Sequence, residues 1–149
     1  MGSEVKTTIK GLESLIKSYQ ERSDRALKIN AETMSTIVSL VEGNAEKLIR
    51  NKTSKGKATR YNPKRTVTVS AEGKAPNSDL GDLIKGIVHD VKKTKRGLVI
   101  GTIRSKAPYS FDLEYGTEKM AKRPFMRPAL KGSRKQILKI IAEGLKRAL

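Results

Sequence analysis

Residues 86–104 read GIVHDVKKTKRGLVIGTIR and carry the clearest structural signal in the chain. Two apolar-containing segments, 86–93 and 98–104, flank residues 94–97, which end in a glycine that can adopt a positive φ angle. The pattern predicts a β-hairpin. We expect the packed face of this hairpin to consist of Ile87, Val91, Leu98, Ile100 and Ile103.

Upstream of the hairpin, the apolar spacing predicts two helices. Residues 9–19 form the first, and Ser23 or Asp24 can cap a longer second helix that runs to about residue 51. The apolar stripe of the second helix is expected to be Leu27, Met34, Ile37, Val38, Val41, Ala45, Leu48 and Ile49.

A loop and a short strand are expected to follow. Residues 52–65 are polar and basic and predict a loop, whereas 66–70 alternate as a short strand with Val67 and Val69 facing inward.

Three further elements complete the prediction. Residues 79–85 fit a helical turn with Leu80, Leu83 and Ile84 inward. Residues 108–115 fit a short helix closed by Gly116, and 117–127 fit an extended loop. Pro128 is then expected to start a last helix that runs to Leu149. The stripe of this helix is expected to be Leu130, Ile137, Ile141 and Leu145 or Leu149.

The order of these elements predicts one α+β domain over residues 1–149. A small, mainly antiparallel sheet, made of the hairpin plus the short strand, is expected to be packed by a long N-terminal helix and a C-terminal helix. The domain divides into a helical N-terminal part (1–51), a basic loop (52–65), and a remainder (66–149) that holds the sheet, a motif loop and the C-terminal helix.

Composition limits the chemistry of the chain. Its 149 residues include no cysteine and one histidine, His89, which excludes a thiolate metal site and a cysteine nucleophile. No apolar run approaches the roughly 20 residues of a membrane span, and the N-terminus lacks the apolar core of a signal peptide. The acidic pairs Asp79/Asp82 and Asp112/Glu114 fit capping and solvated residues better than metal ligands. Because nucleotide-binding and nucleophile motifs are also missing, we expect no enzymatic activity, cofactor or metal.

Charge indicates an acidic partner. The formal net charge is +17, and the excess is uneven. Residues 51–75 carry seven basic and one acidic side chain, and residues 116–149 carry ten and two. The basic loop can grip phosphates, with Tyr61 stacking on a base, although a solvated loop explains the same residues equally well. Its candidate contact residues are Lys52, Lys55, Lys57, Arg60, Lys64 and Arg65.

The most distinctive stretch, residues 107–130, reads APYSFDLEYGTEKMAKRPFMRPAL. Two prolines stiffen a segment that presents Phe125 and Met126 between Arg123 and Arg127, which suits a docking site. The alternative is that Phe125 fills the core of its own domain beneath the last helix.

The motifs Ala-Pro-Tyr, Leu-Glu-Tyr-Gly-Thr and Arg-Pro-Phe-Met-Arg-Pro-Ala-Leu, in this order, resemble the head–tail joining, or tail-completion, proteins of long-tailed lambdoid bacteriophages. The resemblance covers roughly residues 79–130, and the first 50 residues match only in helical character. Gly86 stands where serine is usual, and Ser110 where alanine is frequent. The resemblance implies a non-enzymatic component of the virion neck, made in the host cytoplasm, that completes the tail as a ring of six copies and joins it to the filled head.

The resemblance also marks a candidate interface with other subunits and with other neck and tail proteins. Phe125 and the prolines are expected to shape the fold and a subunit contact, and the two arginines to pair with acidic groups of a neighbour. The basic loop is expected to face DNA in the lumen, without reading its sequence, or a neighbouring protein. The matching positions are Glu114, Tyr115, Gly116, Thr117, Arg123, Pro124, Phe125, Arg127 and Pro128.

Three alternatives stay open at this point. A tail terminator and a head-closure protein share the size and the ring habit of a completion protein. A basic module that binds nucleic acid as a free monomer would share the charge.

Overall fold

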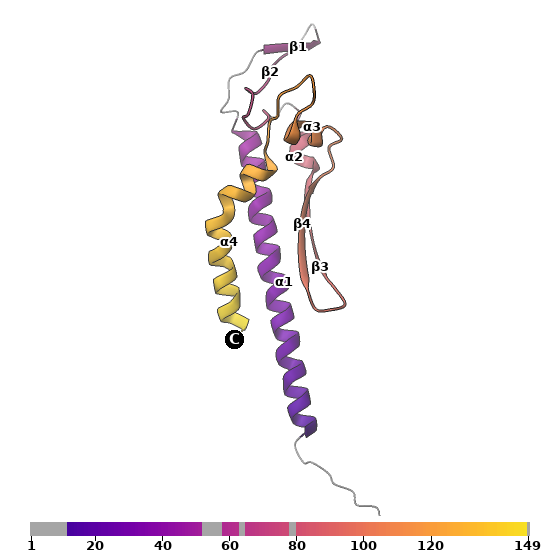
Figure 1. The fold of residues 1–149 in the computed structure, drawn as a ribbon, viewed down its shortest axis with the longest axis vertical. Helices are drawn as coiled ribbons and strands as arrows, with labels where there is room; N and C mark the ends of the chain where they lie inside the picture. The colour runs from indigo at the N-terminus through magenta and orange to yellow at the C-terminus, as the bar shows by residue number, and fades with distance from the viewer. Residues whose placement is uncertain (1–11, 52–57, 63–64, 78–79, 149) are drawn as a thin grey trace, which may run out of the picture.

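A computed structural model describes residues 12–51, 58–62, 65–77 and 80–148. It confirms the α+β class. The elements, in chain order, are helix α1 (Leu12–Arg50), strands β1 (Ala58–Asn62) and β2 (Arg65–Thr68), helix α2 (Asp82–Gly86), strands β3 (Ile87–Lys93) and β4 (Val99–Ser105), and helices α3 (Ser110–Tyr115) and α4 (Met126–Ala148). Helix α1 lies in the middle, with α4 along one side and the β3–β4 hairpin along the other (Figure 1).

Helix α1 is one continuous helix of 39 residues. The predicted break between residues 19 and 24 is therefore wrong. Ser23 and Asp24 are good capping residues, but no glycine or proline occurs between Leu12 and Glu42 to stop the helix. The predicted stripe is correct at its C-terminal end, where Val38, Val41, Ala45 and Ile49 are buried.

The predicted hairpin forms, with β3 and β4 antiparallel and Ile87 opposite Ser105. Gly97 takes the expected positive φ angle, 76°. On β4 the predicted face is wrong at Leu98 and Ile100, which are exposed, and correct at Ile103, which is partly buried together with Val99. A one-residue shift moves every side chain of a strand to the other face.

Gly101 explains this misplaced face. A Cβ atom at this position would lie 2.6 Å from Cγ1 of Val38 and 2.7 Å from Sδ of Met34. Because Gly101 has no side chain, β4 lies directly against α1. The packed face of the strand therefore includes a glycine, which a pattern of apolar side chains does not identify.

The short strand does not join the hairpin. Strand β2 pairs antiparallel with β1, and the chain holds two separate two-stranded sheets among the described residues. The predicted loop at 52–65 is thus a strand over Ala58–Asn62, and 52–57 and 63–64 lie outside the described residues. Val69 follows β2 and is half-buried.

Helix α4 starts at Met126, two residues before the predicted Pro128, and packs along α1 through small residues. Ala129, Ser133 and Gly144 are buried, and Ile137 is partly buried as predicted. The rest of the predicted stripe is wrong: Leu130, Ile141 and Leu145 are exposed, and Leu149 lies outside the described residues.

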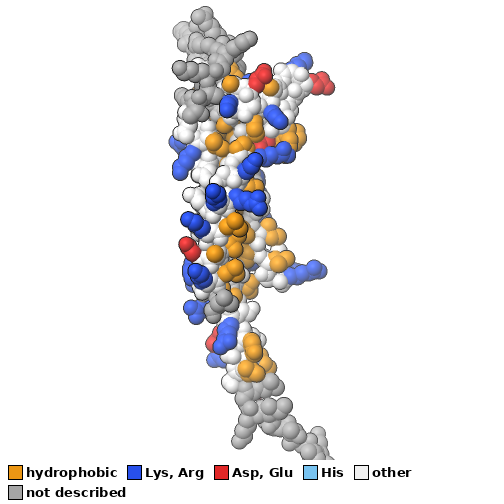
Figure 2. All heavy atoms as spheres, turned by 60° about the vertical axis from the view of Figure 1, so that its left-hand side comes forward, with side chains coloured by type: hydrophobic (Ala, Val, Ile, Leu, Met, Phe, Trp, Pro, Cys, Tyr) orange, Lys and Arg blue, Asp and Glu red, His pale blue; other side chains and the backbone are white. Residues whose placement is uncertain are grey.

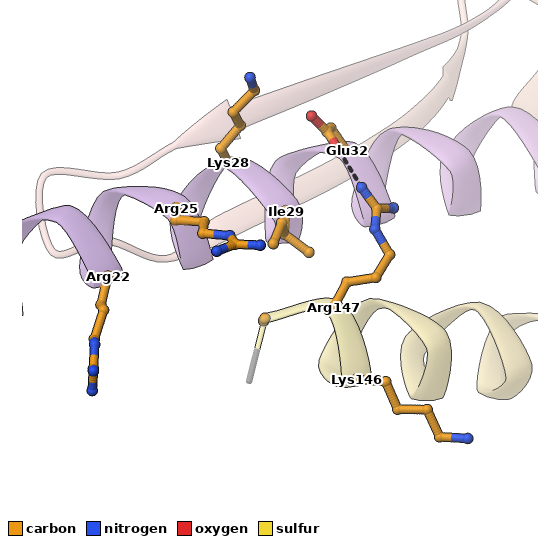
Figure 3. Close-up of a pocket in the computed structure, with 8 residues that line it drawn as sticks. Arg22, Arg25, Lys28, Ile29, Glu32, Lys146 and Arg147 are labelled. Atoms are coloured by element: carbon orange, nitrogen blue, oxygen red, sulfur yellow. Dashed lines mark hydrogen bonds and ion pairs between the residues drawn. The ribbon is translucent and has the colours of Figure 1, made fainter.

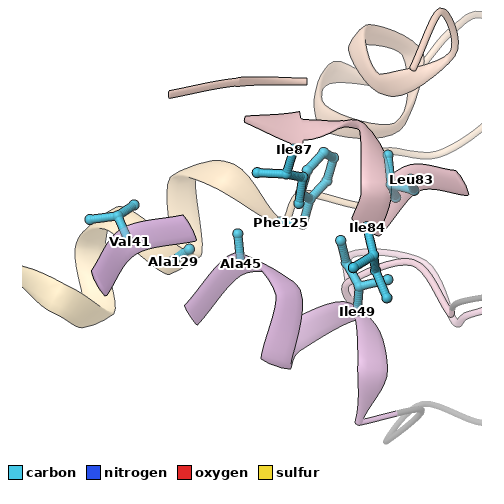
Figure 4. Close-up of a cluster of buried hydrophobic side chains, with 8 residues drawn as sticks. All are labelled: Val41, Ala45, Ile49, Leu83, Ile84, Ile87, Phe125 and Ala129. Atoms are coloured by element: carbon cyan, nitrogen blue, oxygen red, sulfur yellow. The ribbon is translucent and has the colours of Figure 1, made fainter. Parts of the chain in front are cut away.

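The main core lies where the C-terminal end of α1 meets α2, the start of β3 and the start of α4 (Figure 4). Leu83 and Ile84 are buried there as predicted, whereas Leu80 is exposed. Its members are Val41, Ala45, Ile49, Leu83, Ile84, Ile87, Phe125 and Ala129. Among the described residues, none of the helices has the length and apolar character needed to cross a membrane.

Candidate functional site

Glu114, at the end of α3, caps the first turn of α4. Its Oε2 accepts hydrogen bonds from the backbone N–H groups of Phe125 and Met126, at 2.8 and 3.0 Å, and its Oε1 accepts one from the N–H of Arg127 at 2.9 Å. The side chain is buried. A helix N-terminus carries unpaired donors and a partial positive charge, so a buried carboxylate is stabilised there.

The capping leaves no donor of this first turn unused. Pro128 has no N–H, and the N–H of Ala129 already donates to the carbonyl of Phe125 at 3.2 Å. The three remaining N–H groups, of residues 125–127, all donate to Glu114. Glu114 accepts hydrogen bonds from three N–H groups, and Pro128 contributes no N–H. Together they leave no backbone donor of this turn unpaired.

The loop between α3 and α4 is held at several further points. Gly116 has a φ angle of 83°, and a Cβ there would lie 2.9 Å from the carbonyl oxygen of Met120. The N–H of Arg123 donates to the carbonyl of Leu113 at 2.6 Å. The guanidinium Nε of Arg123 donates to the carbonyl of Ser70 at 3.1 Å, which ties the loop to the chain after β2. We call residues 114–128 the motif loop.

The motif loop is in large part an internal structure. Phe125 is 1% exposed and lies in the main core, so the alternative in which it fills its own domain is the one observed. Buried Glu114 and Phe125 present no surface to a neighbour. Arg123 is half-buried with a carbonyl of its own chain as partner, and the predicted acidic partner in a neighbour stays a prediction.

The exposed members of the predicted interface form a different surface. Tyr115, Thr117, Arg127 and Pro128 are exposed, whereas Gly116 and Pro124 are half-buried. The guanidinium carbon of Arg127 lies 4.6 Å from the ring centroid of Tyr115, and that ring lies 4.6 Å from the ring of Phe111. We call Phe111, Tyr115 and Arg127 the aromatic patch. Phe111 is 67% exposed, and it was not among the predicted interface residues because position 111 lies outside the sequence motifs.

A shallow pocket of about 460 Å³ lies beside α3. Leu80, Tyr109, Leu113 and Met120 line it together with Arg123. Burial raises the pKa of Tyr109 above its ordinary value of 10.0, and the negative charge of Asp82 adds to the effect. The apolar part of the lining suits the pocket to binding an apolar side chain.

Helix α4 exposes an apolar stripe on its solvent side. Leu138, Ile141 and Leu145 are three and four residues apart and are all exposed. Figure 2 shows hydrophobic side chains gathered along the middle of the molecule, flanked by lysine and arginine. We call these three residues the α4 stripe. Exposed apolar side chains at helical spacing are typical of a contact surface.

Other predicted site residues are scattered. Arg60 and Arg65 lie on β1 and β2, and Lys52, Lys55, Lys57 and Lys64 lie outside the described residues. His89 is on the hairpin face toward α1, where its Nδ1 lies 2.6 Å from Oε2 of Glu42. No group of three potential metal ligands occurs among the residues that the structure describes.

Comparison with known proteins identifies no relative. None of the family models, curated proteins or solved structures searched matches this chain.

Proposed function

We propose that this chain is a structural protein of the neck of a long-tailed bacteriophage, which completes the tail and joins it to the DNA-filled head. It acts in the virion, after synthesis in the host cytoplasm, as a homo-oligomeric ring. Six copies would match the symmetry of a tail. No enzymatic activity, cofactor or metal is part of the proposal.

One observation carries the proposal. The two halves of the sequence motif that resembles tail-completion proteins contact each other, because Glu114 of the first half binds the backbone of Phe125 in the second. The residues that carry the resemblance therefore form one folded unit, which hydrogen bonds hold together. If the matching residues lay far apart in the structure, the resemblance would support the proposal much less.

The exposed surfaces fit a subunit of an assembly. The aromatic patch and the α4 stripe both expose large apolar side chains to solvent. Monomeric proteins keep such patches small, and subunit contacts bury them. We assign both surfaces to contacts with copies of this chain or with other neck and tail proteins. Lysines of the basic loop would face DNA in the lumen or a neighbouring protein.

Deletion of the gene from the phage tests the proposal. Electron micrographs of lysates should show filled heads and separate tails of normal length, and supply of the wild-type chain should restore joined particles. Overlong tails would indicate a tail terminator, and heads that have lost their DNA would indicate a head-closure protein. Intact virions without the chain would overturn a structural role and favour a free nucleic-acid-binding module.

Complementation with surface variants refines this test. The Phe111→Ala/Tyr115→Ala variant removes two exposed rings and should fail to restore joined particles, although it folds. Leu98→Ala removes another exposed side chain, on the hairpin, and serves as the control that should restore them. Full restoration by both variants would exclude the aromatic patch from the interface.

A further inference from the structure

A basic groove lies where the last turn of α4 meets α1 (Figure 3). It has a volume of about 860 Å³. Arg22, Arg25 and Lys28 line it from α1, and Lys146 and Arg147 line it from α4. Arg25 extends along the groove beside Ile29, whereas Arg22, Lys28 and Lys146 extend outward around it. We call these five cationic residues and the space between them the α1–α4 groove.

Among the described residues, one of the five cations of the groove has an ion-pair partner. Of the described residues that line the groove, Glu32 is the one carboxylate, and its Oε2 accepts a hydrogen bond from Nη2 of Arg147 at 2.9 Å. The other four cations form no ion pair with another described residue. Cations gathered around one concavity repel one another, and a polyanion would relieve that repulsion.

We propose that the α1–α4 groove binds the phosphate backbone of double-stranded DNA without reading its sequence. Arg22, Arg25 and Lys28 are three residues apart, so they rise about 4.5 Å per step along α1 and turn by about 60° per step around it. Duplex DNA carries one negative charge per about 1.7 Å of its axis, and a row of cations beside it displaces condensed counterions. Lys146 and Arg147 extend the row across to the second helix.

The lining favours duplex phosphate over other polyanions. Among the described residues that line it, none has an aromatic side chain on which the bases of a single strand would stack. Its apolar members are Ile29 and Ala148 alone among the described residues. An acidic protein partner would bury an apolar centre inside a polar rim, and this groove offers very little of one.

This site is separate from the basic loop. The loop spans residues 52–65, whereas the groove is built from residues 22–28 and 146–147 of two packed helices. Binding there requires no neighbouring subunit and no neck assembly. A negative result with the purified chain would thus leave the proposed function intact, and a failed phage deletion test would leave the groove intact.

Fluorescence anisotropy with a mixed-sequence 30-base-pair DNA duplex tests the inference. The Arg22→Gln/Arg25→Gln/Lys146→Gln variant should bind about tenfold or more weakly than the wild type. Its slope of log K against log salt should be shallower by about 0.9 for each phosphate that the variant no longer neutralises. All three residues are exposed, so the fold should survive, and circular dichroism checks that it does.

The matched control removes the same charge elsewhere. Lys93→Gln/Lys95→Gln/Arg96→Gln neutralises three exposed cations at the hairpin tip. This variant should bind less than about threefold more weakly than the wild type and keep the wild-type slope within about one unit. Equal weakening in both variants would show that net charge alone attracts DNA, and absence of wild-type binding would overturn the site outright.

Two further measurements test the role of Glu32 and distinguish DNA from an acidic protein as the partner. Glu32→Gln removes the carboxylate of the groove and frees Arg147, so it should tighten DNA binding several-fold; unchanged or weaker binding would contradict the proposal. Poly-L-glutamate of matched charge serves as the probe for an acidic protein. If it bound as tightly as the duplex and was weakened equally in the groove variant, the partner would be an acidic protein instead.

Discussion

The carboxylate of Glu114 lies 2.8 Å from the backbone nitrogen of Phe125, eleven residues further along the chain. Through this bond and those to the next two residues, a side chain of α3 closes the first turn of α4 and fixes the loop between them. The ring of Phe125 enters the core directly below the cap. The carboxylate of Glu114 therefore helps to fix the start of α4 and the position of Phe125 in the core.

Substitution of Glu114 should destabilise the whole domain. Glu114→Gln keeps the size of the side chain but loses its charge and one of its two acceptor oxygens. Charge-assisted hydrogen bonds contribute about 1.5–3 kcal/mol each, so we expect the free energy of unfolding to fall by about 3 kcal/mol. Denaturant titration followed by circular dichroism measures the change.

Asp112→Asn provides the control for Glu114, because it makes the same chemical change at an exposed position of the same helix. It should alter the free energy of unfolding by less than about 0.5 kcal/mol. Similar losses in the two variants would mean that the capping of α4 contributes little to stability.

The chain contains two phenylalanines, which permit a matched comparison. Phe125→Ala removes a ring that is 1% exposed and should cost about 3–5 kcal/mol. Phe111→Ala removes an exposed ring and should cost less than about 1 kcal/mol. Thermal unfolding of both variants decides the point, and a small effect at Phe125 would place the core elsewhere.

The hydrophobic pattern predicted the elements better than their packed faces. The C-terminal stripe of α1 and the hairpin were correct because large apolar residues occupy their buried positions. The predicted faces of β4 and α4 were correct at Ile103 and Ile137 but wrong elsewhere, because Gly101, Ser133 and Gly144 make contacts there. Small residues allow two backbones to pack closely, and a scale of side-chain hydrophobicity does not measure this kind of contact.

The placement of the motif residues could be predicted from sequence only in part. The motif was recognised from sequence, but its spacing gave no sign that Glu114 turns inward to cap a helix, since a carboxylate at a short helix end is normally solvated. The α1–α4 groove was missed entirely. Its residues lie more than 110 positions apart, and residues 1–50, which contribute Arg22, Arg25 and Lys28, are nearly neutral overall.

A hydrogen bond between α1 and α4 gives a third prediction. Nδ2 of Asn44 donates to Oγ of Ser133 at 2.8 Å, and that hydroxyl donates to the carbonyl of Ala129 at 2.7 Å. Ser133→Ala leaves the amide of Asn44 without this acceptor and should cost about 1–2 kcal/mol. In a double-mutant cycle with Asn44→Ala, we expect a coupling energy of about 1 kcal/mol. Strict additivity would contradict a direct contribution of this bond.

Two glycines of α4 should respond to alanine in opposite directions. At Gly132 an added Cβ meets nothing within 4 Å, so Gly132→Ala should stabilise the domain by up to about 1 kcal/mol through helix propensity. At Gly144 the Cβ would lie 2.4 Å from Oγ1 and 2.9 Å from Cγ2 of Thr33, which forces α4 away from α1. We expect Gly144→Ala to cost about 1–3 kcal/mol, as overpacking does. Thr33→Ala removes both clashing atoms and should recover part of that loss in the double variant. The same sign of change at both glycines, in thermal or denaturant unfolding, would show that α4 does not rest on α1 through its small residues.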